Sequence, residues 1–376
     1  MGCNATKRSA RDGLGAIQVQ FAQFLALSLR FLLRKAACVS LSSLCFALVS
    51  LSLCLSLSKR QCAVFDSRPC NTLYQMDQPK SLDFSVIGEP LNNLLIATGN
   101  KLSREWPAKY SNVIGARELF VIHLRVAHMT YLSALYIGED KLQADERRLS
   151  EIVVSLPLLN RAILDSLFTL LFTLEDVPDR CAWFRESDWK ASRLELDRYV
   201  AEYGDSDLPE WKSYLEDLSK ACDMGLALTN LTPAQTANPK ALRSWPNPGA
   251  MVNRGVSPNA SLSPLQEFMK YLNDFFYTDL SQQAKLGGWG IAKRGTMLLD
   301  EIRVKPGIED QIRKFRYAHM GQAVALMLAL ASEIEAHFKF GLRQETLYVW
   351  NVAAPVIFVV NEMYDKRYKS LLGQNR

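Results

Sequence analysis

The sequence lacks most of the residue patterns with which enzymes hold metals, phosphates or activated nucleophiles. Only four histidines occur in 376 residues, and there is neither an HExxH motif nor a CxxC pair. The glycines form neither a GxxxxGK[ST] phosphate loop nor a GxSxG nucleophile elbow. Metal-dependent and serine-hydrolase mechanisms therefore have no support, and we expect neither a metal nor a cofactor.

Acidic residues are scarce only near the N-terminus. Residues 1–75 carry nine Lys or Arg and two Asp, a net charge of +7, whereas the whole chain carries +5. Residues 76–376 therefore have a net charge of −2 and lack the overall basic field of nucleic-acid-binding proteins. We do not expect a nucleic acid as the main partner, although a local basic face and an oligomer both stay open.

Cysteine is also rare in most of the chain, because six of the eight cysteines lie in the first 70 residues. Their spacing fits no zinc pattern. Cys62 and Cys70 could form a disulfide if that stretch faced an oxidising compartment. We expect Cys181 and Cys222 to be buried free thiols.

Charge is absent from residues 36–58, which read AACVSLSSLCFALVSLSLCLSLS. Such a segment would be about 34 Å long as a helix, enough to cross a bilayer. We therefore predict a single transmembrane helix within an N-terminal extension that covers residues 1–75. More positive charge precedes the segment than follows it, which favours a cytoplasmic N-terminus and an exported body.

A different start of translation would change the expected localisation. The first methionine after Met1 is Met76, immediately before the pattern of the body begins. If translation starts there, residues 1–75 are not part of the protein and the body is cytoplasmic.

The body, residues 76–376, has the period of amphipathic helices and no sustained strand alternation. We predict an all-α bundle of seven or eight helices, with a core helix at 347–360. Pro157 should kink or divide its helix. Six of the fifteen prolines fall between 231 and 264, which predicts a long crossing loop, with Trp245 packed on the bundle. The expected helices cover 113–138, 145–176, 178–204, 207–228, 264–285, 308–341 and 343–372.

Two polar patterns interrupt these apolar helices. Arg161 and Asp165 are four residues apart, and Tyr277, Ser281 and Lys285 follow one another at the same interval. Each set therefore shares one helix face. We predict that the five side chains form one polar pocket between two helices. The alternatives are a structural ion pair in the first helix and a simple helix end near Lys285 in the second.

The stretches RAILDSLFTLLFTLED, SWPNPG and FFYTDLSQQAK together resemble an uncharacterised family of bacterial all-helical proteins. The resemblance covers roughly residues 110–290. That family carries an Arg-x3-Glu helix and, later, a Tyr-x2-Leu-Ser helix followed by a His. Here Asp165 stands in place of the Glu and Lys285 in place of the His, so any chemistry of that His would be missing. Such proteins are sometimes placed near nuclease-like families of phage defence.

Helical ribonucleases of the HEPN type use an Arg followed, four to six residues later, by a His. Arg117 with His123, and Arg313 with His319, match this spacing. Because His123 lies on a largely apolar helix, we expect it to be a core residue. The candidate catalytic pair is then Arg313 and His319, and the alternative is a solvated basic start to a long helix.

From the sequence we thus expect a membrane-tethered helical binding or interaction module. The alternative is a HEPN-like ribonuclease or another enzyme associated with phage defence. The sequence leaves open whether the protein is an enzyme, and it identifies no partner.

Overall fold

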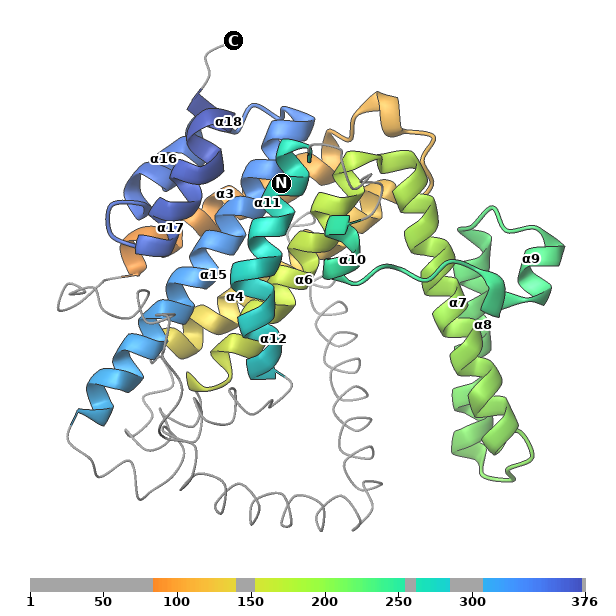
Figure 1. Ribbon diagram of the computed structural model, residues 1–376. Coiled ribbons are helices and arrows are strands. Elements are labelled where there is room, and N and C mark those ends of the chain that lie inside the picture. Colours follow the sequence, from red (N-terminus) through yellow and green to blue (C-terminus); the bar gives the residue numbers. More distant parts are fainter. Residues whose placement is uncertain (1–83, 140–152, 254–261, 285–306, 374–376) are drawn as a thin grey trace, which may run out of the picture. The chain divides into compact units, whose positions relative to one another are not determined.

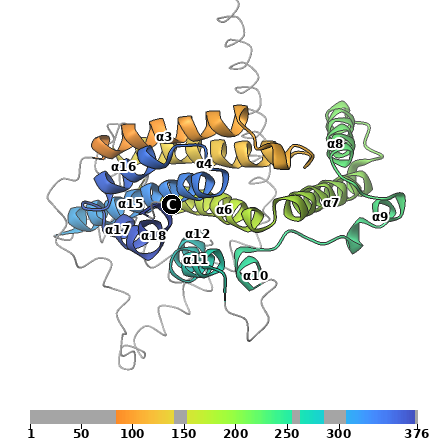
Figure 2. The same ribbon diagram turned by 90° about the horizontal axis from the view of Figure 1, so that it is seen from above.

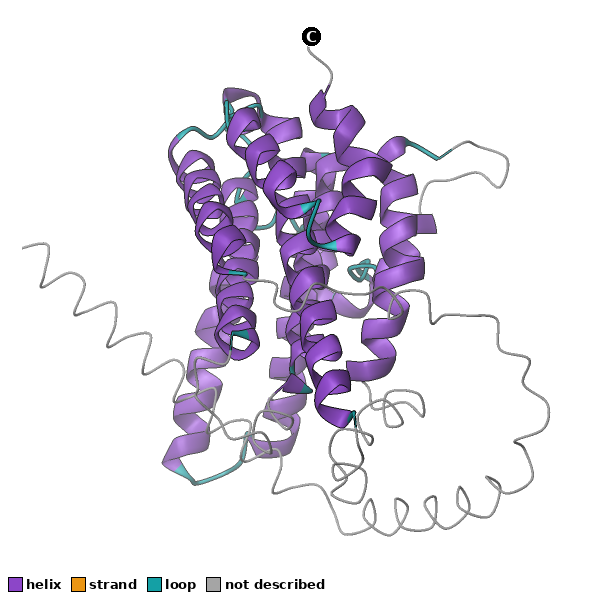
Figure 3. Ribbon diagram, turned by 90° about the vertical axis from the view of Figure 1, so that its left-hand side faces the viewer, coloured by secondary structure: helices purple, strands orange, loops and turns teal. Residues whose placement is uncertain are grey.

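Helices make up every regular element in the computed structural model, which describes residues 84–139, 153–253, 262–284 and 307–373. No strand occurs within these ranges, so the predicted all-α class is confirmed (Figure 3). The described residues belong to one unit, which covers Tyr74–Arg376. The proposed membrane segment 36–58, the cysteines of the N-terminal extension and Lys285 lie outside the described residues.

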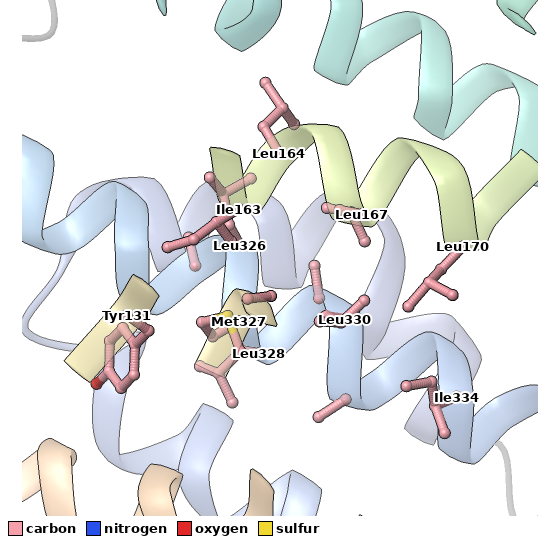
Figure 4. Close-up of a cluster of buried hydrophobic side chains, with 14 of the residues drawn as sticks. Tyr131, Ile163, Leu164, Leu167, Leu170, Leu326, Met327, Leu328, Leu330 and Ile334 are labelled. Atoms are coloured by element: carbon pink, nitrogen blue, oxygen red, sulfur yellow. The ribbon is translucent and has the colours of Figure 1, made fainter. Parts of the chain in front are cut away.

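Two helices, α6 (Leu156–Glu175) and α15 (Ile308–Phe338), form the middle of the bundle. Nearly every side chain of α15 from residue 319 to residue 335 is buried, as expected for a helix that is enclosed on all sides. Leu167 of α6 points towards Leu330 of α15 in the core between them (Figure 4). Burial of each such leucine contributes about 1.5–3 kcal/mol, so the packing of α6 on α15 stabilises the middle of the bundle.

Outer helices cover both sides of this middle layer (Figures 1 and 2). On one side lie α3 (Ser85–Arg104) and α4 (Ala116–Gly138), which the short turn η2 (Ala108–Tyr110) connects. On the other side lie α11 (Pro264–Leu272) and α12 (Thr278–Ala284). Because α6 contacts α4 as well as α12, polar side chains on α6 can meet partners from either layer.

Helix boundaries follow local sequence signals. The Asp176 side chain accepts a hydrogen bond from the Asp179 backbone N–H and caps α7 (Val177–Tyr203), which ends at Gly204. Pro157 lies in the first turn of α6, where its missing N–H costs nothing, so of the two predicted outcomes it divides the segment 145–176 and does not kink α6.

In the C-terminal region one prediction was wrong, because residues 347–360 do not form a single core helix. The helix α16 (Arg343–Ala353) ends just before Pro355, and α17 (Phe358–Met363) begins after a turn. Pro355 has no N–H and cannot continue the helical hydrogen bonds. The chain then continues through the π-helical segment η5 (Tyr364–Tyr368) into α18 (Lys369–Gly373).

The proline-rich region contains short helices, which raises the number of elements above the seven or eight expected. They are α9 (Pro233–Ala237), η3 (Pro239–Ala241) and α10 (Pro248–Asn253). Between η3 and α10, Trp245 packs with its ring centre 5.0 Å from that of Phe184, so its predicted packing on the bundle is confirmed.

The α7–α8 hairpin forms a separate small core. The first turns of α7 pack on α4 and α6, whereas α8 (Pro209–Ala227) packs mainly on α7 (Figure 1). Buried Trp189, Leu196 and Cys222 hold the two helices together. Cys181 and Cys222 are buried free thiols, as predicted.

Two described helices, α4 and α6, are long and apolar enough to cross a membrane. The apolar window of α6 is 72% buried inside the bundle, as befits a core helix, whereas that of α4 is only 33% buried. The outward face of α4 exposes Ile122, Val126, Met129 and Tyr136.

Candidate functional site

Arg161 is the centre of a polar cluster between α6 and α12. Its Nη1 donates to the Ser281 hydroxyl oxygen at 3.0 Å, and its Nη2 lies 3.0 Å from a carboxylate oxygen of Asp165. Its guanidinium carbon lies 3.5 Å from the centre of the Tyr277 ring, in cation–π contact. The structure thus brings together four of the five residues predicted to form a pocket, while Lys285 lies outside the described residues.

The cluster holds the Arg161 guanidinium in place but leaves it partly exposed to solvent. The side chain of Arg161 is 17% exposed and that of Asp165 is 49% exposed. Burial raises the pKa of Asp165, and the nearby charge of Arg161 partly offsets this rise. The Arg161 guanidinium is therefore held in place from three sides, whereas its carboxylate partner remains accessible to water.

A π-helical segment presents Tyr277 to this cluster. The segment η4 (Asn273–Tyr277) lies between α11 and α12, and the Thr278 N–H bonds to the Asn273 carbonyl across its wider turn. Such π-turns are rare in helices and occur often at functional sites. The Tyr277 ring also packs edge-on against Phe168 of α6, which fixes the ring on which Arg161 lies.

The residue before Arg161 builds a second polar contact on another face of α6. Asn160 is fully buried, and its Nδ2 donates to the His319 carbonyl at 2.8 Å and approaches the Gln322 Oε1 at 3.3 Å. Gln322 Oε1 also lies 2.7 Å from Nδ1 of His319. Because Gln322 Oε1 can only accept, Nδ1 of His319 is the donor in this contact. Both His319 and Asn160 thus tie α6 to α15.

The structure does not bring Arg313 and His319 into one site. Arg313 is exposed near the start of α15 and pairs with Asp310 at 2.5 Å. His319 is fully buried in the core, with its ring packed against Phe315. A general base must reach its substrate within hydrogen-bond distance, and the buried imidazole of His319 does not reach the exposed surface where Arg313 lies.

The other histidines have structural surroundings as well. His123 packs edge-on against Phe184, and burial lowers its pKa to about 4. His128 bonds to the Asn92 side chain at 2.8 Å, and burial lowers its pKa too. His123 is thus half-buried against Phe184 at the edge of the core, so the expectation that it is a core residue is met only in part.

A buried ion pair between η5 and α15 was not predicted from the sequence. Arg367 of η5 makes a two-pronged contact with Glu333 of α15, and the Tyr368 hydroxyl donates to Glu333 at 3.0 Å. Arg367 also donates to the Pro264 carbonyl at 2.9 Å. The Glu333 carboxylate is satisfied by partners of this chain, so this cluster joins the C-terminal helices to α15 and α11 instead of offering a ligand site.

The Arg161 cluster has neither the make-up of a metal site nor a share in the groove between α3 and α16. In the described parts of the chain, no group of three His, Cys, Asp or Glu side chains could hold a metal ion. A groove of about 760 Å³ lies between α3 and α16, with Glu89, Glu345 and Tyr348 among its walls, and it shares no residue with the Arg161 cluster.

Asn160 and Gln322 were missed by the sequence analysis. A signal was present for Asn160, since a polar residue beside Arg161 in a strongly apolar helix needs a partner. Comparison with known proteins adds no name to these clusters, because no family model, curated protein or solved structure matches the chain.

Proposed function

We propose that this protein is a helical binding module, tethered to a membrane by residues 36–58, and that Arg161 is the centre that contacts its ligand. The tether is inferred from the uncharged length of that segment and its flanking basic residues. The exposed apolar face of α4 fits a body that works close to a bilayer.

One observation carries the binding role, which is the arrangement of the Arg161 guanidinium between Tyr277, Ser281 and Asp165. A guanidinium has five N–H donors, and the contacts to Ser281 and Asp165 use only part of that set. Its planar fork suits a carboxylate or a phosphate group, and stacking on Tyr277 orients the plane in advance. The ligand group is therefore an oxyanion.

Asp165 defines how such a ligand would bind. Its half-exposed carboxylate occupies the position of an anion beside Arg161, 3.0 Å from Nη2 of the guanidinium. An incoming oxyanion would replace this internal partner. Asp165 therefore lowers the affinity for ligand while it keeps Arg161 paired in the unliganded state.

The test compares the full chain in detergent with two variants by titrating citrate and inorganic phosphate and following thermal stability. Arg161→Gln should abolish the stabilisation by the anion, and Asp165→Asn should strengthen it. Citrate and phosphate separate carboxylate from phosphate recognition.

The matched control is Arg313→Gln, which removes an arginine that is also paired with an aspartate but lies outside the cluster. It should respond as the wild type does. An equal loss in Arg161→Gln and Arg313→Gln, or no response in the wild type, would overturn the proposed role of Arg161.

Nothing in the described residues favours the HEPN-like ribonuclease, because His319 is buried and Arg313 is exposed elsewhere on α15. The resemblance to the uncharacterised bacterial family stays an expectation from the sequence, and it supplies no activity.

A further inference from the structure

The end of the α7–α8 hairpin carries a cluster of four aromatic side chains, which we call the aromatic end. The rings of Tyr203 and Trp211 are stacked with centres 3.9 Å apart and planes 3° apart. Tyr199 and Tyr214 pack edge-on against each other at 5.4 Å, and each also lies within about 6 Å of Trp211. All four rings are only partly buried, because only the hairpin itself encloses them.

Exposed aliphatic residues extend this surface. Val200 is 49% exposed and Leu208 is 57% exposed, and both lie in the last turn of α7 or the loop that follows it. The hairpin core at Trp189, Leu196 and Cys222 already joins the two helices. Partly exposed aromatic and aliphatic groups of this kind are typical of protein interaction sites, where Tyr and Trp contribute most of the binding energy.

The charge around the aromatic end determines which partner fits. Residues 195–217 contain eight acidic and two basic residues, a net charge of −6 within a body whose total is −2. Such a field repels nucleic acids and anionic lipid surfaces and attracts cationic groups. The acids are Glu195, Asp197, Glu202, Asp205, Asp207, Glu210, Glu216 and Asp217.

The chain already shows the matching contact. The guanidinium carbon of Arg198 lies 5.4 Å from the centre of the ring of the adjacent Tyr199, a cation–π contact within the aromatic end itself. Arginine is favoured over lysine at such sites, because its planar guanidinium stacks on rings and pairs with carboxylates in two-pronged fashion.

We propose that the aromatic end of the α7–α8 hairpin binds an arginine-rich segment of a partner polypeptide. Arginines of that segment stack on the rings of Tyr203 and Trp211, and the surrounding carboxylates pair with the remaining positive charge. This interaction is independent of the Arg161 centre, which recognises an oxyanion.

The test uses the full chain in detergent and fluorescence anisotropy of a labelled oligo-arginine peptide. We expect binding that weakens as salt is raised, and affinity for an oligo-lysine peptide of equal length that is lower by about 5-fold or more, since lysine does not stack in the same way. Trp211→Leu, with its helicity checked by circular dichroism, should lower the affinity for oligo-arginine by about 5–10-fold.

A second variant leaves the ring packing untouched and removes charge. Glu202→Gln, Asp205→Asn, Asp207→Asn and Glu210→Gln together should lower the affinity further than Trp211→Leu does. The matched control neutralises four exposed acids on other helices, and it should bind as the wild type does. Its substitutions are Glu105→Gln, Glu118→Gln, Asp274→Asn and Asp365→Asn.

Three results would overturn the proposal. They are no binding of oligo-arginine by the wild type, equal affinity for the two peptides, or an equal loss of affinity in the four-acid variant at the aromatic end and in its four-acid control. Arg161→Gln should leave oligo-arginine binding unchanged, so failure at the aromatic end and failure at the Arg161 centre can be told apart.

Discussion

The guanidinium of Arg161 lies 3.5 Å from the ring centre of Tyr277, a contact that joins α6 to the π-helical segment before α12. Each residue has other partners, since Arg161 pairs with Asp165 and Ser281, and Tyr277 packs on Phe168. The contact therefore links a polar cluster to the apolar core, and its strength can be measured separately from the rest.

A double-mutant cycle of Arg161→Met and Tyr277→Leu tests this contact. We expect a coupling free energy of about 1 kcal/mol, because the guanidinium is mostly buried and stacked on the ring. Urea denaturation of the wild type, the two single variants and the double variant provides the four values. Additive effects of the two substitutions would show that the stacking contributes nothing.

The Glu333–Arg367 pair should respond differently to single and double substitution. Arg367→Met leaves a buried carboxylate without its cation, and we expect the free energy of unfolding to fall by about 3–5 kcal/mol. The double variant Glu333→Leu with Arg367→Met removes both charges and should lose markedly less. A double variant that is less stable than the single one would contradict this account, as measured by denaturant unfolding.

His123 should make stability depend on pH. The pKa of His123 is about 4 in the folded protein, whereas its ordinary value, which applies to the unfolded chain, is 6.5. Between pH 4 and pH 6.5 the unfolded chain therefore binds more protons than the folded protein. The free energy of unfolding should therefore rise from pH 4 to pH 6.5, and the contribution of His123 is lost as the pH falls through this window.

The variant His123→Phe isolates that contribution, because the other histidines remain in place. Comparing denaturation of the wild type and the variant at pH 4.5 and pH 7.5 should show a difference of up to about 2 kcal/mol between the two pH values. Parallel pH profiles for the two proteins would mean that His123 is not the titrating group.

Local signals in the sequence were sufficient for much of this fold. The expected helix 178–204 closes on Gly204, the C-cap of α7, and α15 lies within the expected helix 308–341. The i, i+4 spacings of Arg161 with Asp165 and of Tyr277 with Ser281 placed each pair on one face. We predicted that the two pairs meet because a charged group in an apolar helix needs partners.

Other features depend on contacts between distant segments, which no local pattern encodes. Asn160 meets Gln322 across 162 positions of sequence, and Glu333 meets Arg367 across 34. The two π-helical segments were not expected either, because a π-turn is favoured by tertiary packing and has no strong sequence signal. The break at Pro355 was visible in the sequence, but the surrounding apolar run suggested a continuous helix.

The most direct test of a tethered binding module is membrane fractionation of the full chain, tagged at its C-terminus, with protease added from outside the cells. The account predicts that the tagged body sediments with membranes, resists extraction by alkaline carbonate and is cleaved from outside, and that deletion of residues 36–58 releases it. A soluble tagged protein whose N-terminus is Met76 would contradict the tether and place the Arg161 centre and the aromatic end inside the cell.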